Sequence, residues 1–212
     1  MSQHFTLTDE NYEAVKALAV ASLRAGDVVC MAMEGGYVYA AYAFDQNAIS
    51  TIHRMREAQP GTQAQILVGE ISTVLGIATN FSGELEKLAS KFWPGPLTLL
   101  LSPQRGLAWD LGDGGELEHF AVRMPSRKFI HDVISATGPV AVASASVSGM
   151  PPMTNINFVQ GEEVALFIDE GEIQENLTSS IVEKREDGLH LIREGSLSRE
   201  TLAEIAPILA SS

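Results

Sequence analysis

Short apolar runs, separated by segments with helical spacing of apolar residues, constrain the fold of this chain more than any other feature. A continuous apolar run of a few residues is typical of a strand buried on both faces, as in a sheet covered by helices. Runs of this kind occupy residues 27–33, 65–69, 97–101, 120–124 and 140–143. Their alternation with helical patterns predicts an α/β fold.

The predicted helices are marked by their ends as well as by their spacing. A first helix is expected from about Thr8 or Asp9 to Gly26, and a second from Asp45, its N-cap, to about Glu57. Further helices are expected at residues 81–92, at 126–138 with Ser126 as N-cap, and at about 198–209. Strands are also expected at residues 164–168, 180–183 and 189–192.

Length and composition agree with one soluble domain. The chain has 212 residues, of which 45% are hydrophobic, enough to bury one core. No run of 18 apolar residues occurs, and the N-terminus lacks a signal-peptide pattern. The single cysteine, Cys30, excludes an internal disulfide and a cysteine-only metal site. We therefore expect a cytoplasmic protein that does not interact with membranes.

The net charge argues against a protein that coats nucleic acid. With 14 basic and 27 acidic residues the formal charge is −13, which repels a phosphate backbone at long range. Twelve of the acids lie between Glu162 and Glu204, and such an excess usually forms a solvated face. The total does not exclude a local cationic pocket.

Two arginines and a serine-rich turn are candidates for an anion site. Arg123 and Arg193 each end a largely apolar strand, where an arginine must reach solvent, pair with a carboxylate or bind an anion. The turn at 144–149 follows a buried strand, and its small residues and hydroxyls could contact phosphate oxygens. Serine-rich turns without a ligand are commoner, and His53, Arg54 and Arg56 could simply complement a helix dipole.

Several kinds of chemistry have no support in the sequence. The histidines lack metal-ligand spacing and no Cys-x-x-Cys occurs, so no metal site is predicted. Neither a Gly-x-Ser-x-Gly nucleophile elbow nor a Gly-Lys-Ser/Thr phosphate loop is present. No residue is predicted to act as a covalent catalyst.

Five ordered segments carry a family resemblance. They are residues 91–99 (KFWPGPLTL), 121–125 (AVRMP), 138–149 (GPVAVASASVSG), 179–182 (SSIV) and 193–195 (REG). In this order they resemble the YrdC/TsaC family, synthases that make threonylcarbamoyl-AMP for tRNA modification. The similarity extends over about residues 14–208, so the whole chain, 1–212, is identified as a single, divergent YrdC-like domain.

The resemblance implies a fold and a reaction. The fold is a single-domain, twisted mixed sheet flanked by helices around a deep cationic cavity. The reaction joins L-threonine, bicarbonate and ATP, with Mg²⁺, and releases pyrophosphate in the t6A pathway of tRNA modification. This transferase chemistry needs cations to offset the triphosphate charge and tight positioning of the carbamoylated threonine. It needs no protein nucleophile.

The first family motif, Pro-Thr-Asp-Thr-x-Tyr-Gly, is altered here. It aligns without gaps onto residues 32–38, where Tyr37 alone is unchanged. Gly35 stands in place of the threonine-contacting hydroxyl and has no side chain to donate. Glu34 replaces the aspartate conservatively.

The second motif, Lys-x-Arg, is altered as well. Aligned onto residues 56–58, it has arginine for lysine at Arg56 and alanine for arginine at Ala58, whereas a register two residues earlier, 54–56, keeps its arginine. Arginine and lysine are not equivalent at a phosphate contact. Ser146 also stands where the family has asparagine.

These comparisons give the candidate substrate- and nucleotide-binding residues. They are Tyr37, Arg56, Arg123, Ser144, Ser146, Ser179 and Arg193. We expect a synthase whose turnover is reduced on the order of 10³-fold, at about 2 kcal/mol for each of Gly35 and Ala58. The alternative is a weak or inactive relative that binds a nucleotide or RNA without synthase chemistry. Any binding of tRNA or double-stranded RNA is expected to be weak.

Overall fold

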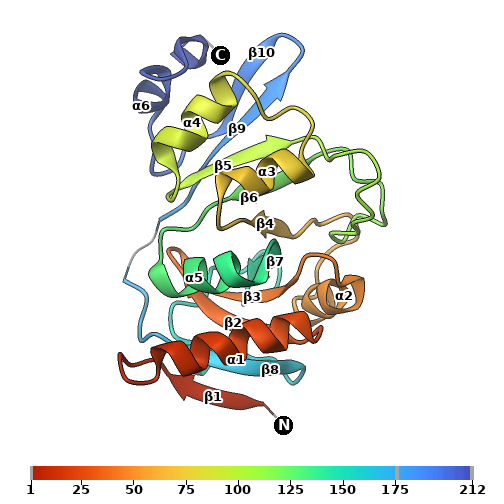
Figure 1. The fold of residues 1–212 in the computed structure, drawn as a ribbon, viewed down its shortest axis with the longest axis vertical. Coiled ribbons are helices and arrows are strands. Elements are labelled where there is room, and N and C mark those ends of the chain that lie inside the picture. The colour runs from red at the N-terminus through yellow and green to blue at the C-terminus, as the bar shows by residue number, and fades with distance from the viewer. Residues whose placement is uncertain (1, 175–176, 211–212) are drawn as a thin grey trace.

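The structure, a computed structural model, describes residues 2–174 and 177–210 and places ten strands in one mixed sheet (Figure 1). The strands are β1 (Gln3–Thr6), β2 (Val28–Met33), β3 (Gly36–Tyr42), β4 (Gln65–Leu67), β5 (Leu97–Leu101), β6 (Phe120–Arg123), β7 (Val140–Ser144), β8 (Val164–Asp169), β9 (Ser180–Arg185) and β10 (Gly188–Arg193). Their order across the sheet is β1-β8-β2-β3-β7-β4-β6-β5-β9-β10. The apolar runs that predicted strands therefore lie in the interior of the sheet.

Helices cover both faces of this sheet. They are α1 (Tyr12–Arg24), α2 (Gln46–Met55), α3 (Ile71–Ile77), α4 (Glu84–Phe92), α5 (Lys128–Thr137) and α6 (Arg199–Ala203). α1 and α5 pack on one face, against residues such as Val29 and Ala40. The other four pack on the opposite face, in a core that includes Cys30 and Ala41. The predicted α/β fold, a twisted mixed sheet flanked by helices, is confirmed.

Three elements were not predicted from the sequence. β1 is a mostly exposed edge strand, so it lacks an apolar run. β3 follows β2 after a turn of two residues, Glu34 and Gly35, and pairs with it from Met33 opposite Gly36. α3 is only seven residues long and has no side-chain cap.

Four predicted helix boundaries are wrong. α1 begins at Tyr12 and not near Thr8 or Asp9, and α4 begins at Glu84 and not at residue 81. Ser126 does not cap α5, whose N-cap position is taken by Arg127; the backbone N–H and Oγ of Ser126 instead donate to a carboxylate oxygen of Glu34. The last helix is α6 alone, and a separate 3₁₀ turn begins at Pro207, which lacks the N–H needed to continue a helix. The N-cap predicted at Asp45 is confirmed, since its Oδ1 accepts from Ala48 N at 2.9 Å. In residues 2–174 and 177–210 no helix has the length and apolar character needed to cross a membrane.

Candidate functional site

A cavity of about 370 Å³ opens where the β2–β3 hairpin, the ends of β6 and β7, and the segment before β9 meet. Six of the seven residues predicted for the site line it. They are Tyr37, Arg56, Arg123, Ser144, Ser179 and Arg193. The seventh, Ser146, is buried directly behind the wall, where its Oγ lies 2.9 Å from that of Ser144. Residues separated by up to 156 positions in the chain are thus gathered around one space.

Strand registers explain why several of these side chains share a face. β3 pairs Val38 with Ser144 of β7, β7 pairs in turn with β4, and β4 pairs with β6 up to Arg123. Because alternate residues of a strand point to the same side, Val38, Ser144, Gln65 and Arg123 all lie on the face where α1 and α5 pack. The cavity is therefore built on the sheet itself.

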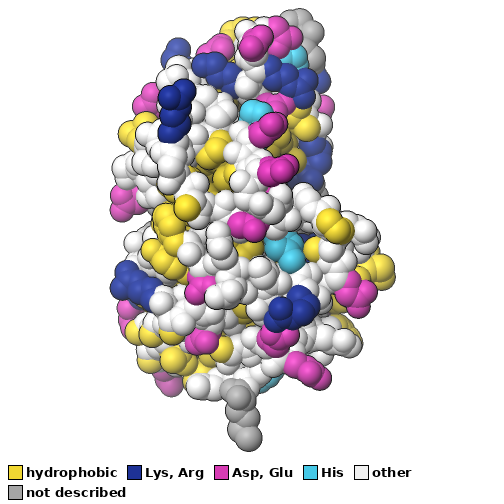
Figure 2. Space-filling view, turned by 90° about the vertical axis from the view of Figure 1, so that its right-hand side faces the viewer, with side chains coloured by type: hydrophobic (Ala, Val, Ile, Leu, Met, Phe, Trp, Pro, Cys, Tyr) yellow, Lys and Arg dark blue, Asp and Glu magenta, His cyan; other side chains and the backbone are white. Residues whose placement is uncertain are grey.

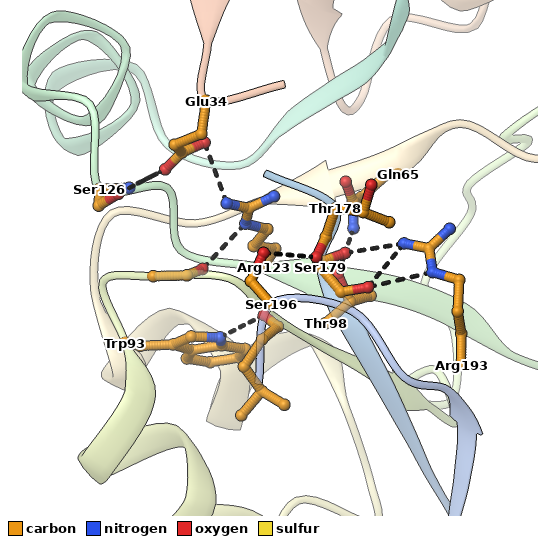
Figure 3. Close-up of polar contacts among 12 residues, drawn as sticks. Glu34, Gln65, Trp93, Thr98, Arg123, Ser126, Thr178, Ser179, Arg193 and Ser196 are labelled. Atoms are coloured by element: carbon orange, nitrogen blue, oxygen red, sulfur yellow. Dashed lines mark hydrogen bonds and ion pairs between the residues drawn. The ribbon is translucent and has the colours of Figure 1, made fainter. Parts of the chain in front are cut away.

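Arg123 is held by a buried carboxylate. Its Nη2 lies 3.0 Å from Oε2 of Glu34, and both side chains are only 2% exposed. Nε of Arg123 donates to the carbonyl of Gly95 at 2.9 Å, and Oε1 of Glu34 accepts from Ser126 (Figure 3). Burial alone would raise the pKa of Glu34, but the Arg123 charge and the Ser126 hydrogen bonds outweigh it and hold that pKa below its usual range. Glu34 is therefore a carboxylate near neutral pH.

A chain of hydrogen bonds fixes Ser179 and Arg193. Nε2 of Gln65 donates to Thr98 Oγ1 at 3.0 Å, and Thr98 Oγ1 donates to Ser179 Oγ at 2.8 Å. Arg193 Nη2 donates to the same Oγ at 3.1 Å and, with Nε, to the Ser179 carbonyl (Figure 3). Since Ser179 Oγ accepts twice, its own proton is left for an acceptor in the cavity. These bonds leave the Ser179 hydroxyl able to donate.

Arg56 and the serine turn brace each other. Arg56 Nε donates to the carbonyl of Ser146 at 3.2 Å, and the backbone N–H of Ser148 donates to the Arg56 carbonyl at 2.7 Å. Burial lowers the pKa of Arg56 from its ordinary value. The turn that was predicted as an anion cradle is thus attached directly to the cation that ends α2.

The cavity is cationic although the chain is acidic. Among the described residues, no carboxylate forms an ion pair with Arg56 or Arg193, whereas Arg54 outside the cavity pairs with Glu163. Burial lowers the pKa of Arg123 most, Glu34 raises it, and the positive charge of Arg193 lowers it further. Arg193 is therefore close enough to Arg123 for their charges to interact. On the surface shown in Figure 2, lysines and arginines lie scattered among acidic side chains. The cavity therefore offers an anion two positive charges that no carboxylate of the described residues offsets through an ion pair.

Tyr37 lines the cavity, but its hydroxyl is bonded on the opposite side of the sheet. β3 alternates, so the Tyr37 side chain lies opposite to that of Val38, within the core beneath α2. Its hydroxyl donates to the Gly171 carbonyl at 2.7 Å and accepts from the backbone of Glu170 at 3.0 Å. The tyrosine anchors the end of β8 to the hairpin, and its hydroxyl is not available to a ligand.

The altered motif positions are placed unequally. Gly35 lines the cavity, and a Cβ added there would lie 3.2 Å from the Leu177 carbonyl, a tight but not prohibitive approach. Ala58 does not line this cavity; it faces a separate hollow beside His53. Arg56 is therefore the motif cation that lines the cavity, and the expected loss of a phosphate contact at Ala58 stays a prediction.

Sequence reasoning missed three contributors to the site: Gln65, Thr98 and Ser126. Thr98 carries a hydroxyl inside an otherwise apolar strand and is only 1% exposed. A polar group in such a strand must be hydrogen-bonded, and this is the signal that could have found it. Gln65 and Ser126 gave no comparable signal, because each stands at the edge of an apolar segment, where exposed polar residues are as common as buried ones. Among the described residues no cluster of acidic, histidine or cysteine side chains could hold a metal ion.

Comparison with known proteins identifies the family. The family model for Sua5, YciO and YrdC proteins, described as "Telomere recombination", matches residues 21–195. The chain belongs to this family. A "putative threonylcarbamoyl-AMP synthase" of Mycobacterium tuberculosis is 31% identical over 199 residues, covering 92% of this chain and 90% of the relative. The predicted YrdC/TsaC membership is confirmed.

Solved structures of Sua5/YciO/YrdC proteins have the same fold. Pyrococcus abyssi Sua5 in complex with L-threonine superimposes with a TM-score of 0.83 at 26% identity, over 97% of this chain. The chain spans 60% of that Sua5 chain. Escherichia coli YciO matches with a TM-score of 0.78 at 20% identity, over 92% of this chain and 97% of its own, which shows the shared fold.

Proposed function

We propose that this Sua5/YciO/YrdC protein binds ATP and L-threonine in the cavity and makes threonylcarbamoyl-AMP at a reduced rate. The observation that carries the proposal is the meeting of Arg56 and Arg193, neither paired with a carboxylate within the described residues, with the donor hydroxyl of Ser179. The naming of relatives as threonylcarbamoyl-AMP synthases and the L-threonine complex of Sua5 support this choice of substrates. Bicarbonate and the tRNA modification pathway follow from the same reaction.

The proposed reaction asks little covalent chemistry of the protein. The amino group of threonine takes up bicarbonate as a carbamate, releasing water. A carbamate oxygen then bonds to the α-phosphorus of ATP while the bond to the β-phosphate breaks, and pyrophosphate leaves. Mg²⁺ arrives with the triphosphate as part of the substrate. The protein contributes positioning and positive charge where negative charge moves.

Each cavity group has a role in that scheme. Arg56 and Arg193 would offset phosphate charge, since both carry net charge that no neighbouring carboxylate cancels. Ser179 would donate its free proton to a phosphate or carboxylate oxygen. Arg123, fixed at two points, would supply a rigid guanidinium for orientation.

The direct test is pyrophosphate release with ATP, bicarbonate and L-threonine. Pyrophosphate that requires all three substrates supports the synthase. ATP binding without pyrophosphate release would favour the alternative of a nucleotide-binding relative, for which Gly35, a bare backbone at the cavity wall, is the relevant observation.

ATP–Mg²⁺ is expected to raise the thermal stability of the wild type. A ligand at 100 times its dissociation constant adds about 2.7 kcal/mol. Arg193→Ala should lose most of this gain, because it removes an unpaired cation from the cavity wall. Arg185→Ala is the matched control, since Arg185 is exposed and paired with Glu183 outside the cavity. Equal gains in both variants would contradict the site.

RNA binding is expected to be weak. The chain carries −13, and on the face shown in Figure 2 lysines and arginines lie among acidic side chains. Affinity for tRNA or double-stranded RNA should therefore fall steeply with salt. Filter binding at two salt concentrations measures this. Tight binding of tRNA at about 0.15 M salt would show that the net charge misled us.

A further inference from the structure

Among the described residues, Glu34 is the one acidic side chain that is fully buried beside the cavity. Among the described charged residues, only Glu34 and Arg123 are buried, with 1% and 2% of their surface exposed. Glu34 stands on the turn of the β2–β3 hairpin, whereas Arg123 and Ser126 belong to β6 and the loop that follows it. A single carboxylate therefore ties three segments together at the cavity wall.

The carboxylate lies behind the cavity wall, and Arg123 borders the cavity with a side chain that is only 2% exposed. Arg123 lines the cavity but Glu34 does not. The carboxylate is fixed from behind, through the Ser126 hydroxyl at 2.7 Å and the Ser126 backbone N–H. Arg123 is in turn fixed through the Gly95 carbonyl at 2.9 Å. Neither group can move without breaking a buried contact.

The ion pair with Glu34 makes Arg123 different from Arg56 and Arg193, the other two arginines of the cavity. Arg56 and Arg193 form no ion pair with a carboxylate of the described chain, so no paired negative charge offsets theirs when an anion approaches. The charge of Arg123 is largely cancelled by Glu34 at 3.0 Å. Arg123 can therefore orient an anion by its fixed geometry but attracts it weakly.

We propose that Glu34 is the positioning residue of Arg123: it holds the guanidinium in place at the cavity wall and limits the affinity of the cavity for anions. Removing its charge without changing its shape should free one further positive charge for the ligand. An anion bound in the cavity then replaces Glu34 as the counter-ion of Arg123. The turnover part of this proposal rests on the proposed synthase function, whereas the binding part requires only an anion.

Inorganic phosphate is the probe for the binding part. Glu34→Gln keeps an oxygen that can accept from Ser126 but carries no charge, and we expect it to bind phosphate about tenfold more tightly than the wild type in calorimetry. Its affinity should also depend more steeply on salt. Glu34→Asp retains the charge and should bind phosphate within a small factor of the wild type. A merely structural role for Glu34 predicts no gain in affinity.

The experiment must also measure the stability of the variant, because an unpaired buried arginine destabilises the fold. Should Glu34→Gln unfold without ligand, phosphate is expected to refold it, since phosphate supplies the missing counter-ion. The double variant Glu34→Gln with Arg123→Gln removes both charges and should fold but bind phosphate less tightly than the wild type. Phosphate affinity of Glu34→Gln equal to or below that of the wild type, or failure of phosphate to refold it, overturns the proposal.

Turnover separates this inference from the proposed function. With ATP as substrate, Glu34→Gln is expected to lower KM, because attraction rises, and to lower kcat, because Arg123 is no longer held. Tighter phosphate binding by a variant of a protein that releases no pyrophosphate would support the role of Glu34 and reject the synthase. Pyrophosphate release by the wild type, together with unchanged phosphate affinity in Glu34→Gln, would support the synthase and reject the role of Glu34.

Discussion

Replacing Arg123 by methionine is expected to lower the free energy of unfolding by about 3–5 kcal/mol at pH 7. The substitution leaves the Glu34 carboxylate, whose side chain is 2% exposed, without its ion pair. Ser126 still donates to it, but two neutral donors do not cancel a buried charge. Denaturation by urea at pH 7 measures the difference.

The size of this loss should depend on pH in a defined direction. In the wild type the folded pKa of Glu34 lies below its usual range. The contribution of the pair is therefore present above the unfolded pKa of about 4.3 and is lost as the pH falls through the folded value. In Arg123→Met, burial without a cation raises the folded pKa, so the neutral acid is tolerated and stability is lost as the pH rises. The two proteins should differ least in acid and most at neutral pH.

Two variants serve as controls for that prediction. Arg123→Met combined with Glu34→Gln leaves no buried charge and should recover much of the stability, with little dependence on pH. Lys128→Met breaks an ion pair with Asp132 on the exposed side of α5, and such pairs contribute little. A pH-independent loss in Arg123→Met would show that packing, and not the charge of Glu34, is responsible.

The sequence carried enough information for most of the sheet, for a physical reason. Strands buried on both faces have continuous apolar runs, so β2, β5 and β7 can be predicted from the sequence. β1 does not, because an exposed edge strand is held by main-chain pairing with β8 and needs no such run. β3 also has an apolar run, but its first residues were matched only to the first family motif and were not recognised as a strand.

The site was foreseen in its cations and hydroxyls but not in its connections. A strand-end arginine signals that it must find a partner, and Arg123 does. Which of 27 acids supplies that partner depends on packing across 89 positions of chain, and no local pattern records it. The same holds for Gln65 and Thr98, whose bond joins residues 33 positions apart.

Tyr37 shows how one missed strand misplaces a residue. Matching the family motif placed Tyr37 among the binding residues but did not give the direction of its side chain. Once β3 is recognised, the alternation of side chains sends Val38 to the cavity face and Tyr37 to the other. A correct strand assignment would have predicted the structural role that its bonds with Asp169 and Gly171 now show.

Restoring a hydroxyl at position 35 is expected to raise synthase turnover about 30-fold. Gly35 lines the cavity and donates nothing from a side chain. A single lost donor typically costs about 2–4 kcal/mol in the transition state, and the lower figure corresponds to about 30-fold. Gly35→Thr adds that donor, and pyrophosphate release under saturating ATP, bicarbonate and threonine measures the gain.

The geometry at the hairpin permits this substitution and supplies its controls. The backbone of Gly35 is in an ordinary region, and its added Cβ would lie 3.2 Å from the Leu177 carbonyl, so that segment must yield by a few tenths of an ångström. Gly35→Val has nearly the same shape without the hydroxyl and should give no gain. Gly36→Thr should destabilise the hairpin instead, since Gly36 has φ of 138° and its Cβ would lie 2.8 Å from the Met153 carbonyl.

Position 58 gives the sharpest contrast with the analysis by sequence. Two lost groups, at Gly35 and Ala58, led us to expect a deficit on the order of 10³-fold. Ala58 faces the hollow beside His53 and not the cavity, so Ala58→Arg should leave turnover unchanged while Gly35→Thr raises it. A gain from Ala58→Arg of the same size as that from Gly35→Thr would mean that an arginine at 58 reaches the phosphates. The two-residue shift of the motif onto Arg54 and Arg56 would then be wrong, and Arg56 would be the substituted lysine.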